Sequence, residues 1–261
     1  MASILTLRAN AKVNLGLHIT GRRDDGYHLM ETLYYPVHEL YDEVELEARQ
    51  DNECSVEMIG MEEVIPMEKN LCYRAFKALA EVHPWGMPGV HIRVRKRIPA
   101  GAGLAGGSSN AAAVLRGLRD LYLPEVSNDM LASLAEPLGA DVPFFIYNRP
   151  LYATGIGTRF EEIPLDLGRY KVEVETLPVH SSTPEAFRGL DLAALPAGGS
   201  LRESLQCPIP EWKDRVRNDL EGPVFARYPE IARLKASFYA SGATFALMTG
   251  SGSACFGMFP I

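Results

Sequence analysis

The sequence has few cysteines and no long apolar segment. Four of its 261 residues are cysteines, and they show neither a C-x-x-C pair nor the spacing of a zinc site. Such usage is typical of a reducing compartment, so we expect a cytoplasmic protein. The N-terminus lacks the apolar core of a signal peptide. No apolar run approaches the ~20 residues that span a bilayer, and we expect no membrane partner.

Positive charge is also scarce. The formal net charge of −7 argues against a general nucleic-acid-binding protein, so we expect no nucleic-acid partner. Basic residues do gather in one strand-like segment, at Arg93, Arg95, Lys96 and Arg97. This basic patch is either a solvated strand face or part of an anion funnel beside the loop that follows it. Its position favours the funnel.

A glycine-rich run, PAGAGLAGGSSNAA at residues 99–112, is the most distinctive stretch of the chain. Glycines permit sharp turns and leave no Cβ to block a ligand. Four of them lie in the run: Gly101, Gly103, Gly106 and Gly107. Ser108 and Ser109 are good helix N-caps, and apolar residues recur at helical spacing over 111–122. Because unpaired N–H groups at a helix start attract anions, the run predicts a phosphate-binding loop.

Three interpretations of this loop compete. Gly101, Gly103 and Gly106 match the dinucleotide fingerprint G-x-G-x-x-G. That motif follows a buried, nearly continuous apolar strand, whereas residues 91–98 alternate with charges. The Walker A spacing is also present, but Gly107 stands where that loop needs a lysine. A flexible turn is the third interpretation, and phosphate binding is favoured because the glycines lead directly into Ser-Ser-Asn.

A strongly alternating segment spans residues 3–20. Period two over this length predicts one strand, or two with a break, with one face in a core. Asn10, Lys12 and Asn14 lie adjacent on the other face. That face is either wet or a site, and a mainly neutral row around one cation favours a site.

Three further features leave their roles open locally. Tyr27 and His28 follow a turn-forming segment, where they can stack on a planar ligand or form a surface pair. Asp141 follows a helix expected over 127–138 with Ser127 or Asn128 as its N-cap, and a cap or turn aspartate is the simplest interpretation of Asp141. The Gly/Ser segment 250–256 is best explained locally as a hairpin turn.

The order of elements indicates an α+β fold with a boundary near Pro164, because strands come early, helices are interspersed and no regular βαβ rhythm occurs. We expect extended segments at 32–37, 44–48, 55–59, 170–176 and 244–249, and a strand, a tight glycine turn and a second strand over 152–160. Helices are expected over 70–82 with Asn70 as N-cap, from Thr183 as N-cap with Pro184 next, and over 229–239.

Together these motifs resemble the GHMP superfamily of small-molecule kinases, named for galactokinase, homoserine, mevalonate and phosphomevalonate kinases. Its phosphate loop is similar to residues 99–112, and its C-terminal glycine motif is similar to TGSGSACF at 249–256. One branch, whose substrate carries a cytidine diphosphate group, also resembles AKVNL at 11–15, DGYH at 25–28, LGADVP at 138–143 and the run that begins with NDL at 218–220. The resemblance covers nearly the whole chain.

The resemblance implies ATP-dependent phosphorylation of the 2-hydroxyl of a methylerythritol unit in non-mevalonate isoprenoid synthesis, with another small alcohol as the alternative substrate. It implies Asp141 as the catalytic base and Lys12 beside it, stabilising charge on the hydroxyl oxygen. Positions that match the acceptor pocket are Asn14, Tyr27, His28, Tyr34, Thr183 and Phe187. There Tyr27 and Phe187 would sandwich the cytosine ring, and His28 would hydrogen-bond its polar edge.

The resemblance also implies an ATP site, with magnesium accompanying the ATP and no dedicated metal site in the protein. Matching positions are Pro99, Gly101, Gly103, Leu104, Gly106, Gly107, Ser108, Ser109 and Asn110, with Asn70, Leu71 and Lys96 near the adenine. The second glycine motif contributes Gly250, Ser251 and Gly252.

The implied architecture has two domains. The first, over 1–163, is an ATP-binding domain similar to domain 2 of ribosomal protein S5, and the second, over 164–261, is ferredoxin-like. Family members usually continue for another helix and strand, so the second domain is expected to be short or cut. Its partner would be a small molecule, and monomer and dimer both stay open. Two other classes also stay open: a nicotinamide-dependent oxidoreductase, and a nucleotide-binding module without catalysis.

Overall fold

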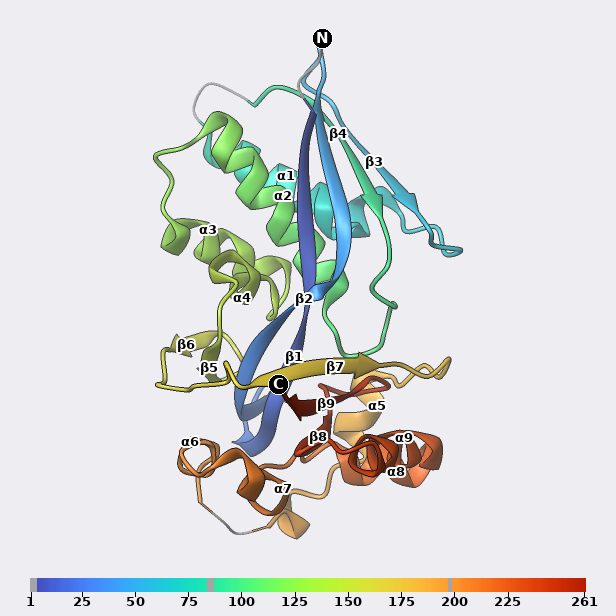
Figure 1. The fold of residues 1–261 in the computed structure, drawn as a ribbon. Coiled ribbons are helices and arrows are strands. Elements are labelled where there is room, and N and C mark those ends of the chain that lie inside the picture. The colour runs from blue at the N-terminus through green and yellow to red at the C-terminus, as the bar shows by residue number, and fades with distance from the viewer. Residues whose placement is uncertain (1–3, 84–86, 197–198) are drawn as a thin grey trace. The chain divides into compact units, whose positions relative to one another are not determined.

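The computed structural model describes residues 4–83, 87–196 and 199–261. The chain divides into two compact units that are discontinuous in sequence (Figure 1). The first unit holds residues 1–11, 36–100 and 105–149, and the second holds residues 12–35, 101–104 and 150–261. The long strands β1 (Ile4–Arg22) and β2 (His28–Ala48) supply residues to both units. The expected boundary at 163/164 concerns continuous domains and stays a prediction.

The strands of the first unit pair through β4 (Val90–Arg95), which contacts two neighbours. It is antiparallel to β2, with Glu43 opposite Arg95, and parallel to β3 (Cys54–Ile59). Helices of this unit lie beside the strands (Figure 1). They are α1 (Leu71–Val82), α2 (Gly106–Tyr122), α3 (Asn128–Ala135) and α4 (Val142–Tyr147), with short 3₁₀ turns at Met67–Lys69 and Glu136–Leu138.

Two predicted caps of the first unit are confirmed. The Asn70 side chain accepts the N–H of Cys72 at the start of α1, and Ser127 accepts that of Met130 at the start of α3. Helix α1 buries one apolar face at Cys72, Ala75, Phe76 and Leu79. The predicted helical periodicity therefore positions both helices against a core.

The cap predicted for α2 is wrong. The helix begins at Gly106, five residues before the expected start, and its N-cap is Ala105 in the left-handed region at φ 56°. Ser108 and Ser109 lie inside the first turn, where the Ser109 N–H donates to the Ala105 carbonyl. Gly106 and Gly107 can adopt helical as well as turn geometry, so the helix begins within the glycine run instead of after it.

The anion funnel predicted from the basic patch is also wrong for the strand residues. Arg93 bonds Glu45 and Glu57 on the two neighbouring strands, each at 2.8 Å, and Arg95 lies 3.5 Å from Glu43. Acidic residues on β2 and β3 face the basic residues of β4 across the sheet, which makes this a solvated strand face with paired charges.

The second unit contains two groups of paired strands. β5 (Leu151–Thr154) pairs with β2 and with β6 (Arg159–Glu161), which confirms the predicted strand–turn–strand. β7 (Tyr170–Glu175), β9 (Cys255–Pro260) and β8 (Phe245–Met248) are antiparallel in this order. Helices of this unit are α5 (Thr183–Arg188), α6 (Leu201–Leu205), α7 (Trp212–Arg215), α8 (Glu221–Arg227) and α9 (Pro229–Ala240), with 3₁₀ turns at Leu192–Ala194 and Ile209–Glu211.

Three sequence predictions for the long strands and for α5 need comment. The alternation over 3–20 is one continuous strand, β1, and the segments expected at 32–37 and 44–48 belong to the single strand β2. The N-cap of α5 is Ser182 rather than Thr183. Thr183 is instead the first helical residue, and its hydroxyl bonds Ser251 at 2.7 Å. The Thr183 hydroxyl therefore bonds Ser251 of the second glycine motif instead of capping α5.

An apolar cluster holds the second unit together, and it draws on β1, α5, α8, α9, β8 and β9. Leu17 and Ile19 of β1 pack with Ile231 and Phe238 of α9. Trp212 stacks edge-on against Phe245, with ring centroids 5.5 Å apart. Along the described stretches of chain, we find no helix with both the length and the apolar character needed to span a bilayer.

Candidate functional site

The polar row on β1 is buried, which contradicts a wet face, and its role as a site stays a prediction. Lys12 is 3% exposed and Asn14 is 2% exposed. The Lys12 ammonium donates to Asn14 Oδ1 at 2.7 Å and to the Gly103 carbonyl at 2.8 Å. A buried ammonium is costly unless oxygens satisfy it, so these contacts define where the Lys12 charge lies in the second unit.

Asn14 is the centre of a buried hydrogen-bond chain. Its Nδ2 donates to Thr32 Oγ1 at 2.8 Å, and the Thr32 hydroxyl donates to the Gly16 carbonyl at 2.7 Å. Its backbone N–H donates to Thr249 Oγ1 at 3.0 Å. The amide of Asn14 is thereby oriented with its oxygen toward Lys12 and its nitrogen toward Thr32.

The loop segment Gly101–Leu104 approaches the second glycine motif closely. A Cβ added to Gly103 would lie 2.3 Å from the Thr249 carbonyl oxygen, and φ of Gly103 is +77°. Only glycine fits both requirements. The Ala254 N–H also donates to the Ala102 carbonyl at 3.1 Å, so this part of the first loop is hydrogen-bonded to the β8–β9 connection.

The β8–β9 connection is a hairpin, as predicted locally from its glycines and serines. Gly250 and Gly252 have φ of +56° and +77°, in the left-handed region. The Ser251 hydroxyl bonds that of Thr183 at 2.7 Å. The hairpin thus joins the start of α5 to the loop that holds Lys12.

The aromatic residues of the expected acceptor pocket all belong to the second unit. His28 and Phe187 stack on each other, with ring centroids 4.8 Å apart and an interplanar angle of 25°. Tyr27 is 64% exposed, and Tyr34 is buried with the Lys12 ammonium 5.6 Å from its ring centroid. Burial and then the Arg22 charge lower the pKa of His28, which favours the neutral ring. A base sandwiched between Tyr27 and Phe187 stays a prediction.

In the first unit, the start of α2 offers a cradle for an anion. Its N-cap residue makes no side-chain hydrogen bond to the helix, and the dipole of its 17 residues is positive at this end. Gly107 is exposed, and a Cβ added there would make an ordinary contact with Leu71 of α1 at 3.8 Å. Ser108 is half-buried and Ser109 is buried, whereas Pro99 before the loop is exposed.

Lys96 and Asn110 meet at a residue that the sequence analysis missed, Asp42. The Lys96 ammonium bonds the Asp42 carboxylate and lies 3.1 Å from Asn110 Oδ1. Asp42 also accepts the N–H groups of Arg97 and Ile98 at 2.7 and 2.8 Å. A signal was present, because Asp42 falls in the same alternation as the apolar residues 44 and 46, which predicts a buried charge.

Asp141 occupies the N-cap position of α4, a helix that the sequence analysis did not predict. Its carboxylate makes no capping hydrogen bond, and the residue is half-buried. The N–H of Val142 donates to the Gly139 carbonyl, and a Cβ added to Gly139 would lie 3.9 Å from Ser108 Oγ. The turn before Asp141 is therefore close to the start of α2 in the first unit. Lys12 belongs to the second unit, and its pairing with Asp141 stays a prediction.

Comparison with known proteins adds family evidence to this geometry. The profile for the GHMP kinases N terminal domain matches residues 70–149, and that for the GHMP kinases C terminal domain matches residues 209–260. The 4-diphosphocytidyl-2-C-methyl-D-erythritol kinase of Parabacteroides distasonis is 42% identical over 250 residues, covering 96% of this chain and 90% of the relative. That of Azobacteroides pseudotrichonymphae is 40% identical, with coverages of 96% and 91%.

Solved structures agree with this relationship. A crystal structure of 4-(cytidine 5'-diphospho)-2C-methyl-D-erythritol kinase has a TM-score of 0.79 and 36% identity, covering 97% of this chain and 90% of that one. The homoserine kinase from Cytophaga hutchinsonii shares the fold, with a TM-score of 0.71, 17% identity and coverages of 98% and 85%. The predicted α+β fold of the GHMP kinases is thus confirmed, and the chain belongs to the GHMP kinases and, within them, to the family of 4-diphosphocytidyl-2-C-methyl-D-erythritol kinases.

Proposed function

We propose that this kinase transfers the γ-phosphate of ATP to the 2-hydroxyl of 4-diphosphocytidyl-2-C-methyl-D-erythritol, in the non-mevalonate route to isoprenoid precursors. The observation that carries the proposal is 42% identity to a kinase named for this substrate over 96% of the chain. The buried Lys12 ammonium supports it. The resemblance expects this position to stabilise negative charge on the reacting hydroxyl, and the ammonium is held there by hydrogen bonds to Asn14 and Gly103.

The start of α2 is the proposed phosphate cradle. Free N–H groups at a helix N-terminus suit the charge of the phosphates without any movement of side chains. Ser108 and Ser109 would add hydroxyl contacts there, and Asn70, Leu71 and Lys96 would lie near the adenine. Gly250, Ser251 and Gly252 would line the site from the second glycine motif.

Magnesium is proposed as the companion of ATP, where it neutralises phosphate charge. The described residues contain no group of three or more His, Cys, Asp or Glu side chains suited to a metal. Magnesium that accompanies ATP needs no such group, because it is held mainly by phosphate oxygens and water. The Ser108 hydroxyl would be the protein's oxygen nearest to it.

Asp141 is the proposed base, taking the proton of the 2-hydroxyl as the oxygen attacks phosphorus. Its carboxylate is available for this because it makes no capping hydrogen bond to α4. Lys12 would stabilise negative charge on the hydroxyl oxygen. Phosphoryl transfer depends mostly on positioning and charge stabilisation, and fixed donors of this kind supply both.

The acceptor pocket is proposed to involve Asn14, Tyr34 and Thr183 around the alcohol, and Tyr27, His28 and Phe187 around the cytosine. The lowered pKa of His28 supports this role, because a neutral imidazole can both donate to and accept from the polar edge of a base. We propose a cytoplasmic enzyme whose partner is this small molecule.

A substrate panel tests the proposal. Purified protein with ATP and magnesium is expected to release ADP with 4-diphosphocytidyl-2-C-methyl-D-erythritol, and not with mevalonate or homoserine. Asp141→Asn is expected to lose roughly several kcal/mol of transition-state stabilisation in kcat while nucleotide binding remains. Turnover of another alcohol in place of the cytidine substrate would overturn the assignment.

Cytosine recognition distinguishes this substrate from other alcohols. Phe187→Ala is expected to raise KM for the cytidine substrate by about tenfold, since base–aromatic stacking contributes about 1–3 kcal/mol. KM for ATP serves as the internal control and should stay unchanged. An unchanged KM for the cytidine substrate would favour a different alcohol.

A further inference from the structure

We propose that Thr249 is a positioning residue that fixes the Lys12 ammonium, and that Asn218 and Glu221 hold Thr249 in place. The inference rests on the proposed function, in which Lys12 stabilises charge on the reacting hydroxyl. Thr249 follows β8 and is fully buried. It would act through Lys12 and Asn14 and would not itself touch the substrate.

Thr249 and Lys12 share the same two acceptors. The Thr249 hydroxyl lies 3.1 Å from Asn14 Oδ1 and 3.4 Å from the Gly103 carbonyl oxygen. These are the oxygens that receive the Lys12 ammonium, at 2.7 and 2.8 Å. The same hydroxyl accepts the Asn14 N–H at 3.0 Å. The single hydrogen of the Thr249 hydroxyl therefore goes to Asn14 Oδ1, at the shorter distance, or is shared with the Gly103 carbonyl, and both oxygens are acceptors of the Lys12 ammonium.

Thr32 completes the arrangement on the other side of Asn14. Its hydroxyl accepts from Asn14 Nδ2 and donates to the Gly16 carbonyl. With Thr32 using its hydrogen on Gly16, only the nitrogen end of the Asn14 amide can face it. The oxygen end must then face Lys12 and Thr249, so the amide has one orientation.

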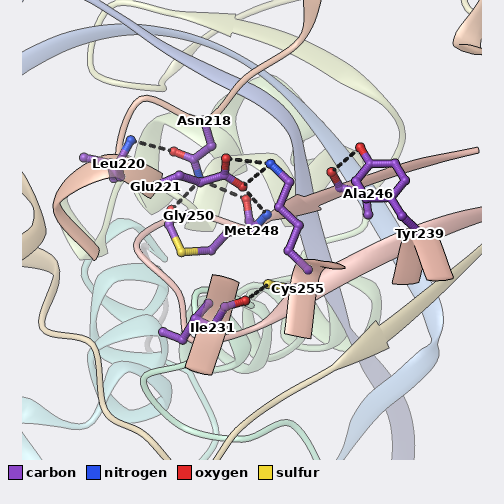
Figure 2. A network of polar contacts seen from close by, with 10 residues as sticks. Asn218, Leu220, Glu221, Ile231, Tyr239, Ala246, Met248, Gly250 and Cys255 are labelled. Atoms are coloured by element: carbon purple, nitrogen blue, oxygen red, sulfur yellow. Dashed lines mark hydrogen bonds and ion pairs between the residues drawn. The ribbon is translucent and has the colours of Figure 1, made fainter. Parts of the chain in front are cut away.

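Asn218 fixes the backbone on both sides of Thr249, as Figure 2 shows. Its Nδ2 donates to the Met248 and Gly250 carbonyls, each at 2.8 Å, and its Oδ1 accepts the Leu220 N–H at 3.0 Å. The two residues that flank Thr249 thus bond to one amide group. Because that amide uses both of its N–H donors on them, it leaves little freedom to the residue between them.

Glu221 adds a charged anchor to the same backbone (Figure 2). Its carboxylate accepts the Met248 N–H at 3.0 Å and the Lys235 ammonium at 2.9 and 2.7 Å. Burial raises the pKa of Glu221, while the Lys235 charge opposes that shift. The anchor thus links α8 and α9 to the end of β8, and through Thr249 to the Lys12 site.

The variant Thr249→Val tests this role, because valine keeps the shape and removes the hydroxyl. Lys12 keeps Asn14 Oδ1 and the Gly103 carbonyl as acceptors, but these oxygens lose their contact with the Thr249 hydroxyl. Since a misplacement of about 1 Å can cost about 10²-fold in rate, we expect kcat to fall by about 10- to 100-fold. KM for ATP should change little, because the Thr249 hydroxyl is not proposed to contact ATP.

Three companion variants make the experiment decisive. Thr249→Ser keeps the hydroxyl and should restore most of kcat. Thr244→Val removes the hydroxyl from the residue just before β8, for which no side-chain hydrogen bond is found within the described residues, and should leave kcat unchanged. Thr249→Val combined with Lys12→Met should be no slower than Lys12→Met alone, because the effect of Thr249 passes through Lys12.

The outcomes separate the two proposals. If the wild-type protein does not turn over the cytidine substrate, the proposed function fails. If it does, and Thr249→Val retains the wild-type kcat or loses rate additively with Lys12→Met, the positioning role is overturned. Thermal melting of every variant identifies loss of folding. If Thr249→Val does not fold, Thr32→Val is expected to show the same fall in kcat at unchanged KM for ATP, and a wild-type kcat there would overturn the role.

Discussion

Two buried lysines, one in each unit, are held by groups of different charge. In the first unit the Lys96 side chain is 8% exposed, and its ammonium bonds the fully buried Asp42 carboxylate. In the second unit Lys12 donates to the amide oxygen of Asn14 and the carbonyl of Gly103. The Asp42 carboxylate carries a charge of its own, whereas the Asn14 and Gly103 oxygens are neutral hydrogen-bond acceptors.

We infer that this difference distinguishes a structural lysine from one suited to chemistry. Asp42 also accepts two backbone N–H groups and the Asn110 amide, so the Lys96 cluster joins β2, the residues after β4, and α2. The Lys12 cluster instead consists of short side chains that orient one another. We infer that the first cluster contributes mainly to stability and the second mainly to kcat, and four experiments test that contrast.

The largest effect is expected for Asp42→Ala. This change leaves the Lys96 ammonium buried without its carboxylate, and the N–H groups of residues 97 and 98 without an acceptor. Breaking a buried pair from one side typically costs about 3–5 kcal/mol of unfolding free energy. Denaturant unfolding measures it. A loss below about 1 kcal/mol, the range of exposed pairs, would break the contrast, because the cluster would then not be structural.

Lys12→Met should come next, and it should affect rate rather than folding. Removing one donor to a developing anion typically costs about 10²–10³-fold in kcat, or about 2.7–4 kcal/mol. Steady-state kinetics measure kcat, with the melting temperature as control. If the variant instead unfolds while its residual kcat per folded molecule is normal, Lys12 is structural as well and the contrast disappears.

A double variant at the Lys96 cluster sharpens the interpretation. Asp42→Asn alone leaves the Lys96 ammonium without its carboxylate, whereas Asp42→Asn with Lys96→Met also removes the ammonium. We expect the double variant to be more stable than the sum of the single effects predicts, with a coupling energy of about 0.5–3 kcal/mol. Urea unfolding of all four proteins gives the cycle. Additive effects would show that the two side chains do not act as a pair.

The smallest effect is expected for Arg93→Ala on the solvated face of β4. Arg93 bonds Glu45 and Glu57 at 2.8 Å, yet exposed pairs typically contribute about 0.2–1 kcal/mol. The change in unfolding free energy should stay below about 1 kcal/mol, and kcat should be unaffected. A marked fall in ATP affinity would contradict the finding of a paired strand face and revive the anion funnel.

Local patterns predicted the parts of the fold whose causes are local. The period of two over residues 3–20 predicted β1, and the N-caps Asn70 and Ser127 lie where expected. The errors occurred where a distant group decides the outcome. Thr183 bonds Ser251 in place of capping α5, and the arginines of β4 meet acids on strands that are distant in sequence. α4 was missed because its six residues are too few to show a helical period.

For the candidate site, the sequence by itself determined the family and predicted the functional positions, because the motifs are short, ordered and chemically specific. It also put Asn10, Lys12 and Asn14 on one side of a strand. Only the tertiary structure decided that this side is buried and which oxygens hold Lys12. The acceptor carbonyl of Gly103 is 91 residues away, and the partner of Asn14, Thr249, is 235 residues away. Alternation states which way a side chain points, whereas what covers it depends on how the chain packs.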